Sequence, residues 1–227
     1  MAELLVALTA FTVFHMLPST PLRAWLIAAL GRRTFMWVFS ILSVLFFGWI
    51  WTAYRAAPVE VHFWVTPLWI RWLSAVILLT AILIAIGAAT GRPRVLLTAE
   101  TALMEPDPVR GVLRITRHPM LWAVVIWGLV HMANNADPAA WVFFGYITLL
   151  ALGGTLLIDR RRTRLLGTAW TPLKEQTSNL PFLAIAQGRT QLSLSEIGWL
   201  RIGAALCLWA LILWAHEDVF GLPAVWF

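Results

Sequence analysis

The sequence predicts an all-α protein, a polytopic integral membrane bundle of about six transmembrane helices. The composition and a series of long apolar runs carry this prediction. Sixty per cent of the 227 residues are hydrophobic, the mean hydropathy is +0.79 and only 12% are charged, whereas soluble domains carry about 25% charged residues. A soluble protein of this length exposes roughly a quarter to a third of its unfolded-chain surface and could not bury so many apolar residues. We therefore expect the lipid bilayer to surround the chain.

Six apolar runs are candidates to cross the bilayer core, which takes about 20 residues of helix. They cover residues 2–17, 34–54, 67–90, 119–135, 139–158 and 199–217. The first and fourth runs are short, as expected for helices with little tilt or for a thin bilayer. Since no segment remains for a soluble domain, we expect a single transmembrane domain over residues 1–227.

Basic residues gather in the connections on one side of the predicted bundle. All of the 17 Lys and Arg residues except Arg55 and Arg71 lie in segments 18–33, 91–117 and 159–201. Connections rich in Lys and Arg stay in the cytoplasm. We therefore expect both termini on the non-cytoplasmic side of a bacterial cytoplasmic (inner) membrane. The net charge of +6 then reflects topology, and without a nucleic-acid-binding motif we expect no nucleic-acid partner.

Histidines inside the predicted spans point to chemistry, because a neutral imidazole tolerates an apolar environment and can bind a metal or a haem iron. His15 lies in the first span, and His131 lies in the fourth, about 20 Å beyond His118 along a helix. The single cysteine, Cys207, and the lack of nearby carboxylates disfavour a zinc site. A haem iron held by two imidazoles needs only what is present. Hydrogen bonding to a neighbouring helix is the alternative role, and His118 or His216 could replace either ligand.

Arg117 and His118 precede Pro119 at the cytoplasmic start of the fourth span. A guanidinium pairs with a carboxylate through two parallel hydrogen bonds, so these two side chains are candidates to bind the propionates of a haem. The same residues also fit the ordinary start of a helix, with proline in its first turn and a basic flank.

Several motifs follow one another along the chain. They are Phe14-His15-Met-Leu-Pro-Ser-Thr-Pro-Leu-Arg23, then Arg114-Ile-Thr-Arg-His-Pro119 with Ile126-Trp-Gly-Leu-Val-His131, and finally Asp159-Arg-Arg, Thr177-Ser-Asn-Leu-Pro-Phe182 and Gly188-Arg189. Together, from residue 11 to about 190, they resemble the NnrU family, which includes 15-cis-zeta-carotene isomerases. The resemblance implies a membrane protein that binds haem b, with His15 and His131 as the axial ligands of the iron.

Three functions stay open from these resemblances. The isomerase branch implies a haem-dependent cis–trans isomerase of a carotenoid-like or other polyene lipid, which would need an electron donor to reduce its haem. That branch has a cysteine three residues before the second histidine, where this chain has Gly128. The bacterial branch implies a haem protein of nitrite and nitric oxide metabolism, as in denitrification, without a carbon substrate. Arg117-His118-Pro119 before a span also resembles the isoprenylcysteine-type membrane methyltransferases, which use S-adenosylmethionine.

Overall fold

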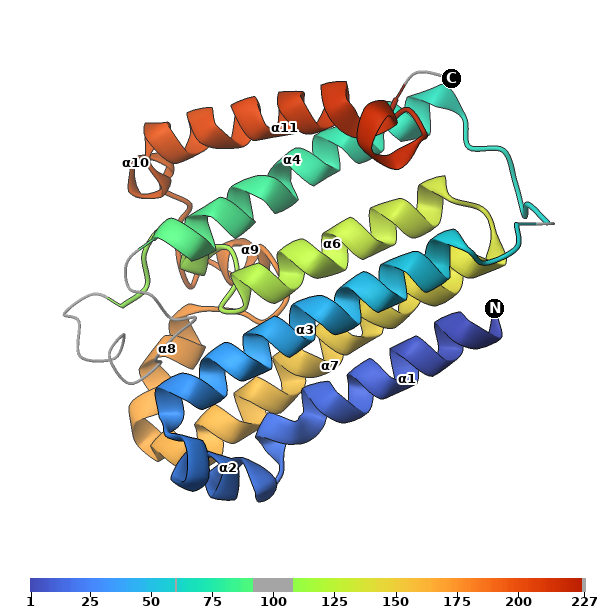
Figure 1. Cartoon of the computed structure of the whole chain (residues 1–227). Helices are drawn as coiled ribbons and strands as arrows, with labels where there is room; N and C mark the ends of the chain where they lie inside the picture. Colours follow the sequence, from blue (N-terminus) through green and yellow to red (C-terminus); the bar gives the residue numbers. More distant parts are fainter. Residues whose placement is uncertain (60, 92–107, 226–227) are drawn as a thin grey trace. The chain divides into compact units, whose positions relative to one another are not determined.

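The computed structural model describes residues 1–59, 61–91 and 108–225, and in this part of the chain it contains helices and no strand. All six apolar runs are helical: α1 (Ala2–Met16), α3 (Arg32–Arg55), α4 (Leu68–Thr90), α6 (Pro119–Asn134), α7 (Pro138–Leu166) and α11 (Trp199–Phe220) (Figure 1). The predicted all-α class is confirmed for the described residues. Most of the predicted connection 91–117 lies outside them, at residues 92–107.

Within the described residues, four helices are long and apolar enough to cross a membrane, judged by length and composition. They begin at Arg32, Leu68, Pro138 and Trp199. The other two predicted spans, α1 and α6, are apolar helices of 15 and 16 residues, somewhat shorter than the roughly 20 residues that a span takes. These helices indicate a membrane protein.

α7 extends beyond the predicted span 139–158. Its last turns carry Asp159 and several arginines, and arginine is a good helix former, so the helix continues after the apolar run has ended. The chain leaves the helix at Gly167, whose φ of +52° is one that glycine adopts without a steric cost.

The described chain forms two compact units. The first consists of Met1–Trp64 with Ala136–Tyr146, and the second of Val65–Asn135 with Ile147–Phe227. α7 is therefore shared between them, with residues 138–146 in the first unit and 147–166 in the second.

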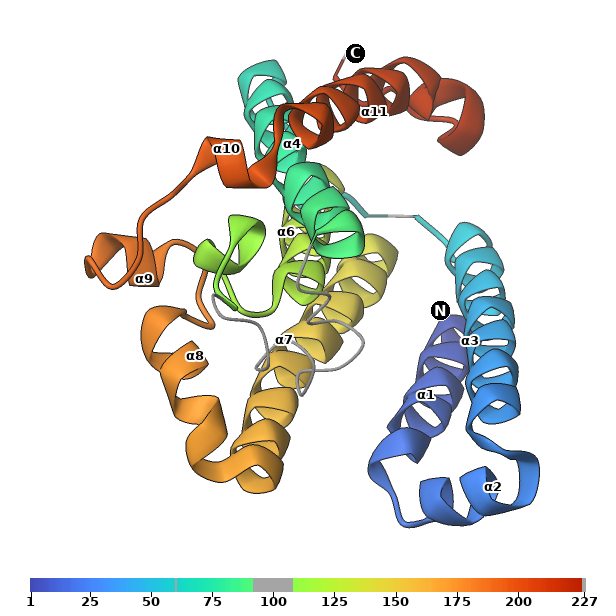
Figure 2. The ribbon, with the colours of Figure 1, turned by 90° about the vertical axis from the view of Figure 1, so that its left-hand side faces the viewer.

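In the first unit, α1 and α3 lie side by side (Figures 1 and 2) and are connected through η1 (Leu17–Ser19) and the short helix α2 (Leu22–Leu30). α1 buries Leu4, Ala7, Leu8 and Phe11, which is the spacing of a helix with one apolar face. The ring of Phe14 stacks on Phe39 and Phe46, with centroids 5.0 and 5.1 Å apart. Aromatic packing therefore holds the two helices together.

In the second unit, α4 packs against both α6 and α11 (Figure 1). Gly87 of α4 also lets the segment before α6 approach closely: a Cβ added to Gly87 would lie only 2.3 Å from Cγ1 of Val112. Polar contacts fix the register, since Nδ2 of Asn134 donates to Oγ of Ser74 at 2.7 Å. α4 ends at Thr90, directly before Gly91.

The chain after α7 runs along one flank of the second unit (Figure 2). It forms η3 (Gly167–Trp170), α8 (Thr171–Gln176), α9 (Leu183–Ala186) and α10 (Leu194–Ile197) before α11 begins. Trp170 and Leu173 of this stretch are buried together with Val109. The stretch also contacts η2 (Gly111–Arg114), the short helix that precedes α6, and this contact builds the site described next.

Candidate functional site

Segments far apart in the sequence meet at the start of α6. The backbone N–H of Arg117 donates to the carbonyl oxygen of Ser178 at 2.9 Å, and that of Phe182 donates to the carbonyl oxygen of Ile115 at 2.8 Å. The motif at residues 114–119 is therefore joined through the main chain to the motif at residues 177–182.

Asp159 of α7 lies at the centre of this arrangement. Its carboxylate accepts hydrogen bonds from Nε and Nη2 of Arg117, at 2.8 and 2.6 Å, and from Nε2 of His118 at 2.8 Å. A carboxylate paired with arginine only accepts hydrogen bonds, so Nε2 of His118 carries a hydrogen. The side chains of Arg117, His118 and Asp159 are only 9%, 3% and 15% exposed. We call these three residues the Asp159 cluster.

The side chain of Asn179 makes hydrogen bonds to the helices on both sides of the Asp159 cluster. Its Nδ2 donates to Oγ1 of Thr155 on α7 at 3.0 Å, and its Oδ1 accepts from Nε1 of Trp122 on α6 at 3.1 Å. Both ends of the amide are thus used, which ties the segment at residues 177–182 to α6 and α7 at once.

A second ion pair joins Arg114 of η2 to Glu196 of α10. Nε and Nη2 of Arg114 donate to the two carboxylate oxygens of Glu196 at 2.7 and 2.8 Å, and the N–H of Gly111 donates to one of them at 2.9 Å. These hydrogen bonds, that from Arg114 first, outweigh the partial burial and hold the pKa of Glu196 below its ordinary value. Glu196 therefore stays ionised and fixes α10 on η2.

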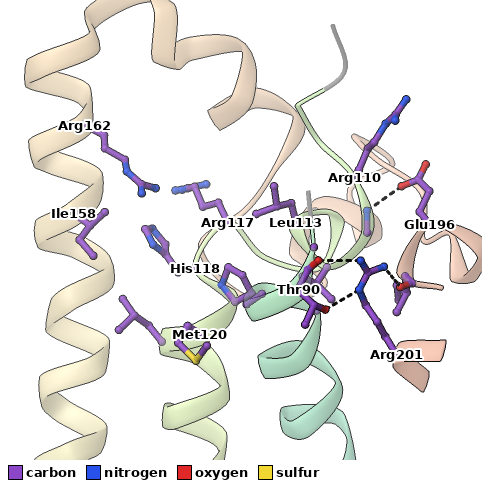
Figure 3. A pocket seen from close by; sticks show the side chains of 18 residues that line it. Thr90, Arg110, Leu113, Arg117, His118, Met120, Ile158, Arg162, Glu196 and Arg201 are labelled. Carbon is purple, nitrogen blue, oxygen red and sulfur yellow. Dashed lines mark hydrogen bonds between the residues drawn. The ribbon is translucent and has the colours of Figure 1, made fainter. Parts of the chain in front are cut away.

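A cavity of about 680 Å³ opens beside the Asp159 cluster (Figure 3). The ends of α4 and α7, the starts of α6 and α11, and residues of η2 and α10 form its walls. Its charged lining residues among those described are Arg110, Arg117, Arg162, Arg201 and Glu196. Leu113, Leu121 and Ile158 add an apolar wall. The cavity is therefore both cationic and partly apolar.

His131 lies near the other end of α6. Its Nδ1 is 2.7 Å from the carbonyl oxygen of Trp127. Because a carbonyl oxygen can only accept, Nδ1 carries the hydrogen and Nε2 keeps its lone pair. Histidines that bind metals commonly donate their other ring N–H to such an oxygen, which fixes the ring and makes the binding nitrogen more basic. The environment of His131 therefore fits a metal ligand.

His15 lies near the end of α1, in the first unit. Its ring stacks on Phe11 with centroids 4.9 Å apart and lies 5.7 Å from the ring of Phe39. Its Nδ1 is buried and has no hydrogen-bond partner among the described residues. Such an atom costs free energy unless something binds it, so His15 also fits a ligand role. Since His131 belongs to the second unit, the pairing of the two imidazoles on one iron stays a prediction.

Arg117 and His118, the predicted partners of haem propionates, lie side by side and share Asp159; their contact with a haem stays a prediction. His216, the other alternative ligand, has Nδ1 at 2.6 Å from the carbonyl oxygen of Leu222. Among the described residues no three His, Cys, Asp or Glu side chains gather around a metal position, but two imidazoles are all that axial ligation of a haem requires.

The site also contains residues that were not predicted from the sequence, namely Asp159, Arg162, Glu196 and Arg201. The signal that could have found Asp159 is its position as the first charged residue after the apolar run 139–158. A carboxylate at the end of a span, in a chain whose connections are mostly basic, is a natural partner for an arginine such as Arg117 at the end of another span.

Comparison with known proteins supports the resemblance of the motifs and extends it over nearly the whole chain. The family described as NnrU protein matches residues 3–224. The chloroplastic 15-cis-zeta-carotene isomerase of Zea mays is 42% identical over 85 residues, and that of Arabidopsis thaliana is 36% identical over 84 residues. These segments cover 36% and 35% of this chain but only 22% of each isomerase. No solved structure matches the chain. With a match over residues 3–224, the chain belongs to the NnrU family.

Proposed function

We propose that the protein is a membrane isomerase that uses haem b to interconvert cis and trans double bonds of a polyene lipid. The observation that carries the proposal is the state of two histidines in apolar helices. The buried Nδ1 of His15 has no hydrogen-bond partner among the described residues, and the Trp127 carbonyl holds His131 in the form whose Nε2 can bind a metal. The similarity to two 15-cis-zeta-carotene isomerases supports the polyene as substrate class.

In this proposal, His15 and His131 would hold the haem iron. Bound haem supplies a redox-active iron, whose reduction needs an electron donor. The chain's own part would be to orient the two imidazole rings and to exclude water from them. The hydrogen bond from Nδ1 of His131 to the Trp127 carbonyl fixes the plane of one imidazole, and Phe11 and Phe39 pack against the other. Aromatic side chains such as these would also suit contact with a hydrocarbon substrate.

The proposal includes six spans in a bacterial cytoplasmic membrane, with both termini on the non-cytoplasmic side. The basic segments support this orientation, because Lys and Arg stay in the cytoplasm. Fusions of alkaline phosphatase, which is active only outside the cytoplasm, test it. Fusions after His62 and at the C-terminus should be active and a fusion after Arg189 inactive, and the opposite pattern would contradict the orientation.

An absorption spectrum of the purified protein, expressed in haem-supplied cells, tests the cofactor. We expect a Soret band that shifts on reduction with dithionite, and we expect His15→Ala combined with His131→Ala to abolish it. His62→Ala is the matched control, because His62 is exposed and should retain full haem. Haem retained by the double variant would refute the ligand assignment. No Soret band in the unmodified protein would refute both the isomerase and the haem protein of nitric oxide metabolism.

Incubation of the reduced protein with 15-cis-zeta-carotene, followed by chromatography of the isomers, tests the reaction. We expect loss of the 15-cis isomer, at a rate that falls in proportion to haem content in the histidine variants. A fully haem-loaded, reduced protein that leaves the isomer pattern unchanged would contradict isomerisation of this polyene. Reversible binding of nitric oxide by the same sample would then favour the nitric oxide alternative.

A further inference from the structure

The cavity beside the Asp159 cluster has a composition that the proposed reaction does not explain. A carotene is a hydrocarbon and offers nothing for arginine to bind. We propose that this cavity binds a phosphate group, carried by an amphipathic molecule whose apolar part lies along Leu113, Leu121 and Ile158. It would be a second ligand site, distinct from His15 and His131; Arg117 and His118, the predicted partners of haem propionates, line it.

Positive charge is concentrated on the walls of the cavity. Four arginines line it, against one carboxylate among the described lining residues, Glu196. That carboxylate is already bound by Arg114 through both of its oxygens. Figure 3 shows Arg117, which lies just before α6, and Arg162 of α7 pointing toward one another. Asp159 balances the charge of one of these two guanidinium groups through its ion pair with Arg117, and the planar fork of arginine suits phosphate oxygens.

Arg201 of α11 shows that this charge is only partly balanced within the protein. Its guanidinium donates to Oγ1 and the carbonyl oxygen of Thr90, at 2.8 and 3.0 Å, and to the carbonyl oxygen of Ile197 at 2.8 Å. All of these partners in the described part of the chain are uncharged. They hold the guanidinium at the wall of the cavity without neutralising it, so Arg201 is positioned in advance for an anion.

The start of α6 adds to the positive potential. Met120 and Leu121, in the first turn of this 16-residue helix, line the cavity. N–H groups in the first turn of a helix lack carbonyl partners within the helix, and this end of the helix carries a partial positive charge. Helix starts of this kind bind phosphate groups in many proteins. Here the helix start and the arginines face the same cavity.

The volume and the position of the cavity agree with a ligand site that is separate from His15 and His131. Its volume of about 680 Å³ lies within the range of about 300–1,000 Å³ typical of small-molecule sites. Neither His15 nor His131 lines it, and His131 is about 20 Å from His118 along α6. Arg164, on the same helix as Arg162, is exposed and does not line the cavity. Membrane topology alone can explain Arg164, whereas the four arginines of the cavity line one common space, which topology does not require.

Binding to the full-length protein in dodecyl maltoside micelles tests the proposal. The probes are dioleoyl phosphatidic acid, dioleoylglycerol with the same tails but no phosphate, and inorganic pyrophosphate. The variants are Arg201→Gln, which removes one charge, and Ile158→Trp, which fills the apolar wall and keeps the charge. Arg164→Gln is the matched control. Loss of a hydrogen-bonded charge should weaken binding about tenfold or more, and added salt should weaken it further.

We expect phosphatidic acid to bind the unmodified protein and Arg164→Gln equally, to bind both cavity variants at least about tenfold more weakly, and dioleoylglycerol not to bind. Pyrophosphate that binds as tightly as phosphatidic acid would identify a soluble phosphate compound as the source of the group. Dioleoylglycerol binding as well as phosphatidic acid, or unchanged binding in both cavity variants, would overturn the proposal. Loss of haem from Arg201→Gln would also overturn it, because the cavity would then serve haem carboxylates; full haem in this variant keeps the two sites separate.

Discussion

Replacement of Asp159 by Asn is the most direct test of the Asp159 cluster. The amide has the same shape as the carboxylate, but it is neutral and carries two N–H groups of its own. In the structure, the carboxylate accepts from Arg117 and His118 at 2.6–2.8 Å. After the substitution the guanidinium would remain in the protein interior without its counter-charge, and at least one N–H group would face another N–H group.

The expected cost follows from this geometry. A hydrogen bond to a charged group contributes about 1.5–3 kcal/mol, and removal of one partner from a buried ion pair costs about 3–5 kcal/mol. Because Asp159 keeps 15% of its side chain exposed, water can reach part of the cluster, and we expect about 3 kcal/mol of lost unfolding free energy. Asp159 and Arg117 share one ion pair. The double variant Asp159→Asn, Arg117→Gln should therefore lose less unfolding free energy than the sum of the two single variants, by about 1 kcal/mol or more.

Reversible unfolding in mixed micelles, with increasing dodecyl sulfate and detection by tryptophan fluorescence, measures this free energy. Glu175→Gln is the matched control: it removes the same charge from an exposed position on α8 and should change stability by less than about 0.5 kcal/mol. If Asp159→Asn were no more destabilising than Glu175→Gln, or if the double variant showed no coupling, the cluster would not contribute to stability as described.

Two further predictions concern the packing and the charge of the second unit. Gly87→Ala should lower the unfolding free energy by about 1–3 kcal/mol, because the added Cβ would lie 2.3 Å from Val112. Gly153→Ala is the control: its Cβ would meet nothing within 4 Å, so it should be neutral or stabilising by up to about 1 kcal/mol. Equal unfolding free energies for the two variants would contradict the close approach of Gly87 to Val112. The ion pair with Arg114 holds the pKa of Glu196 in the folded protein below its ordinary value of 4.5. Ionised Glu196 therefore stabilises the fold fully above pH 4.5, and this contribution is lost as the pH falls through the lower pKa of the folded state. Melting temperatures between pH 7 and pH 3 should therefore fall less steeply in acid for Glu196→Gln than for the unmodified protein, and parallel curves would refute this assignment.

The helices were largely predictable from the sequence, because the pattern of apolar residues is local. Each predicted span became a helix, and the boundary errors have local causes. The apolar run in α7 ends at Ile158, but the helix ends only at Gly167, since charged residues are compatible with a helix and a glycine with positive φ stops it. α1 and α6 are helical as predicted, and their crossing of the membrane stays a prediction.

The site was predictable only in part, because its partners are far apart in the sequence. The motif around Arg117 and His118 stood out by itself, but Asp159 lies more than 40 positions further along, and no spacing rule links the two. Glu196 belongs to a helix of only four residues within a segment that looked like a basic connection. Contacts such as these depend on how α4, α6, α7 and α11 pack, which a single sequence does not encode in any local pattern.

The separation of these partners along the chain also sets an order of events during synthesis. Arg117 and His118 leave the ribosome first and must remain hydrated, or paired with lipid phosphates, until Asp159 emerges 41–42 residues later. The N–H of Gly111 stays without its Glu196 acceptor for longer, since Glu196 follows it by 85 residues. The part of the cavity wall that α10 and α11 provide is therefore missing until these last elements have been synthesised.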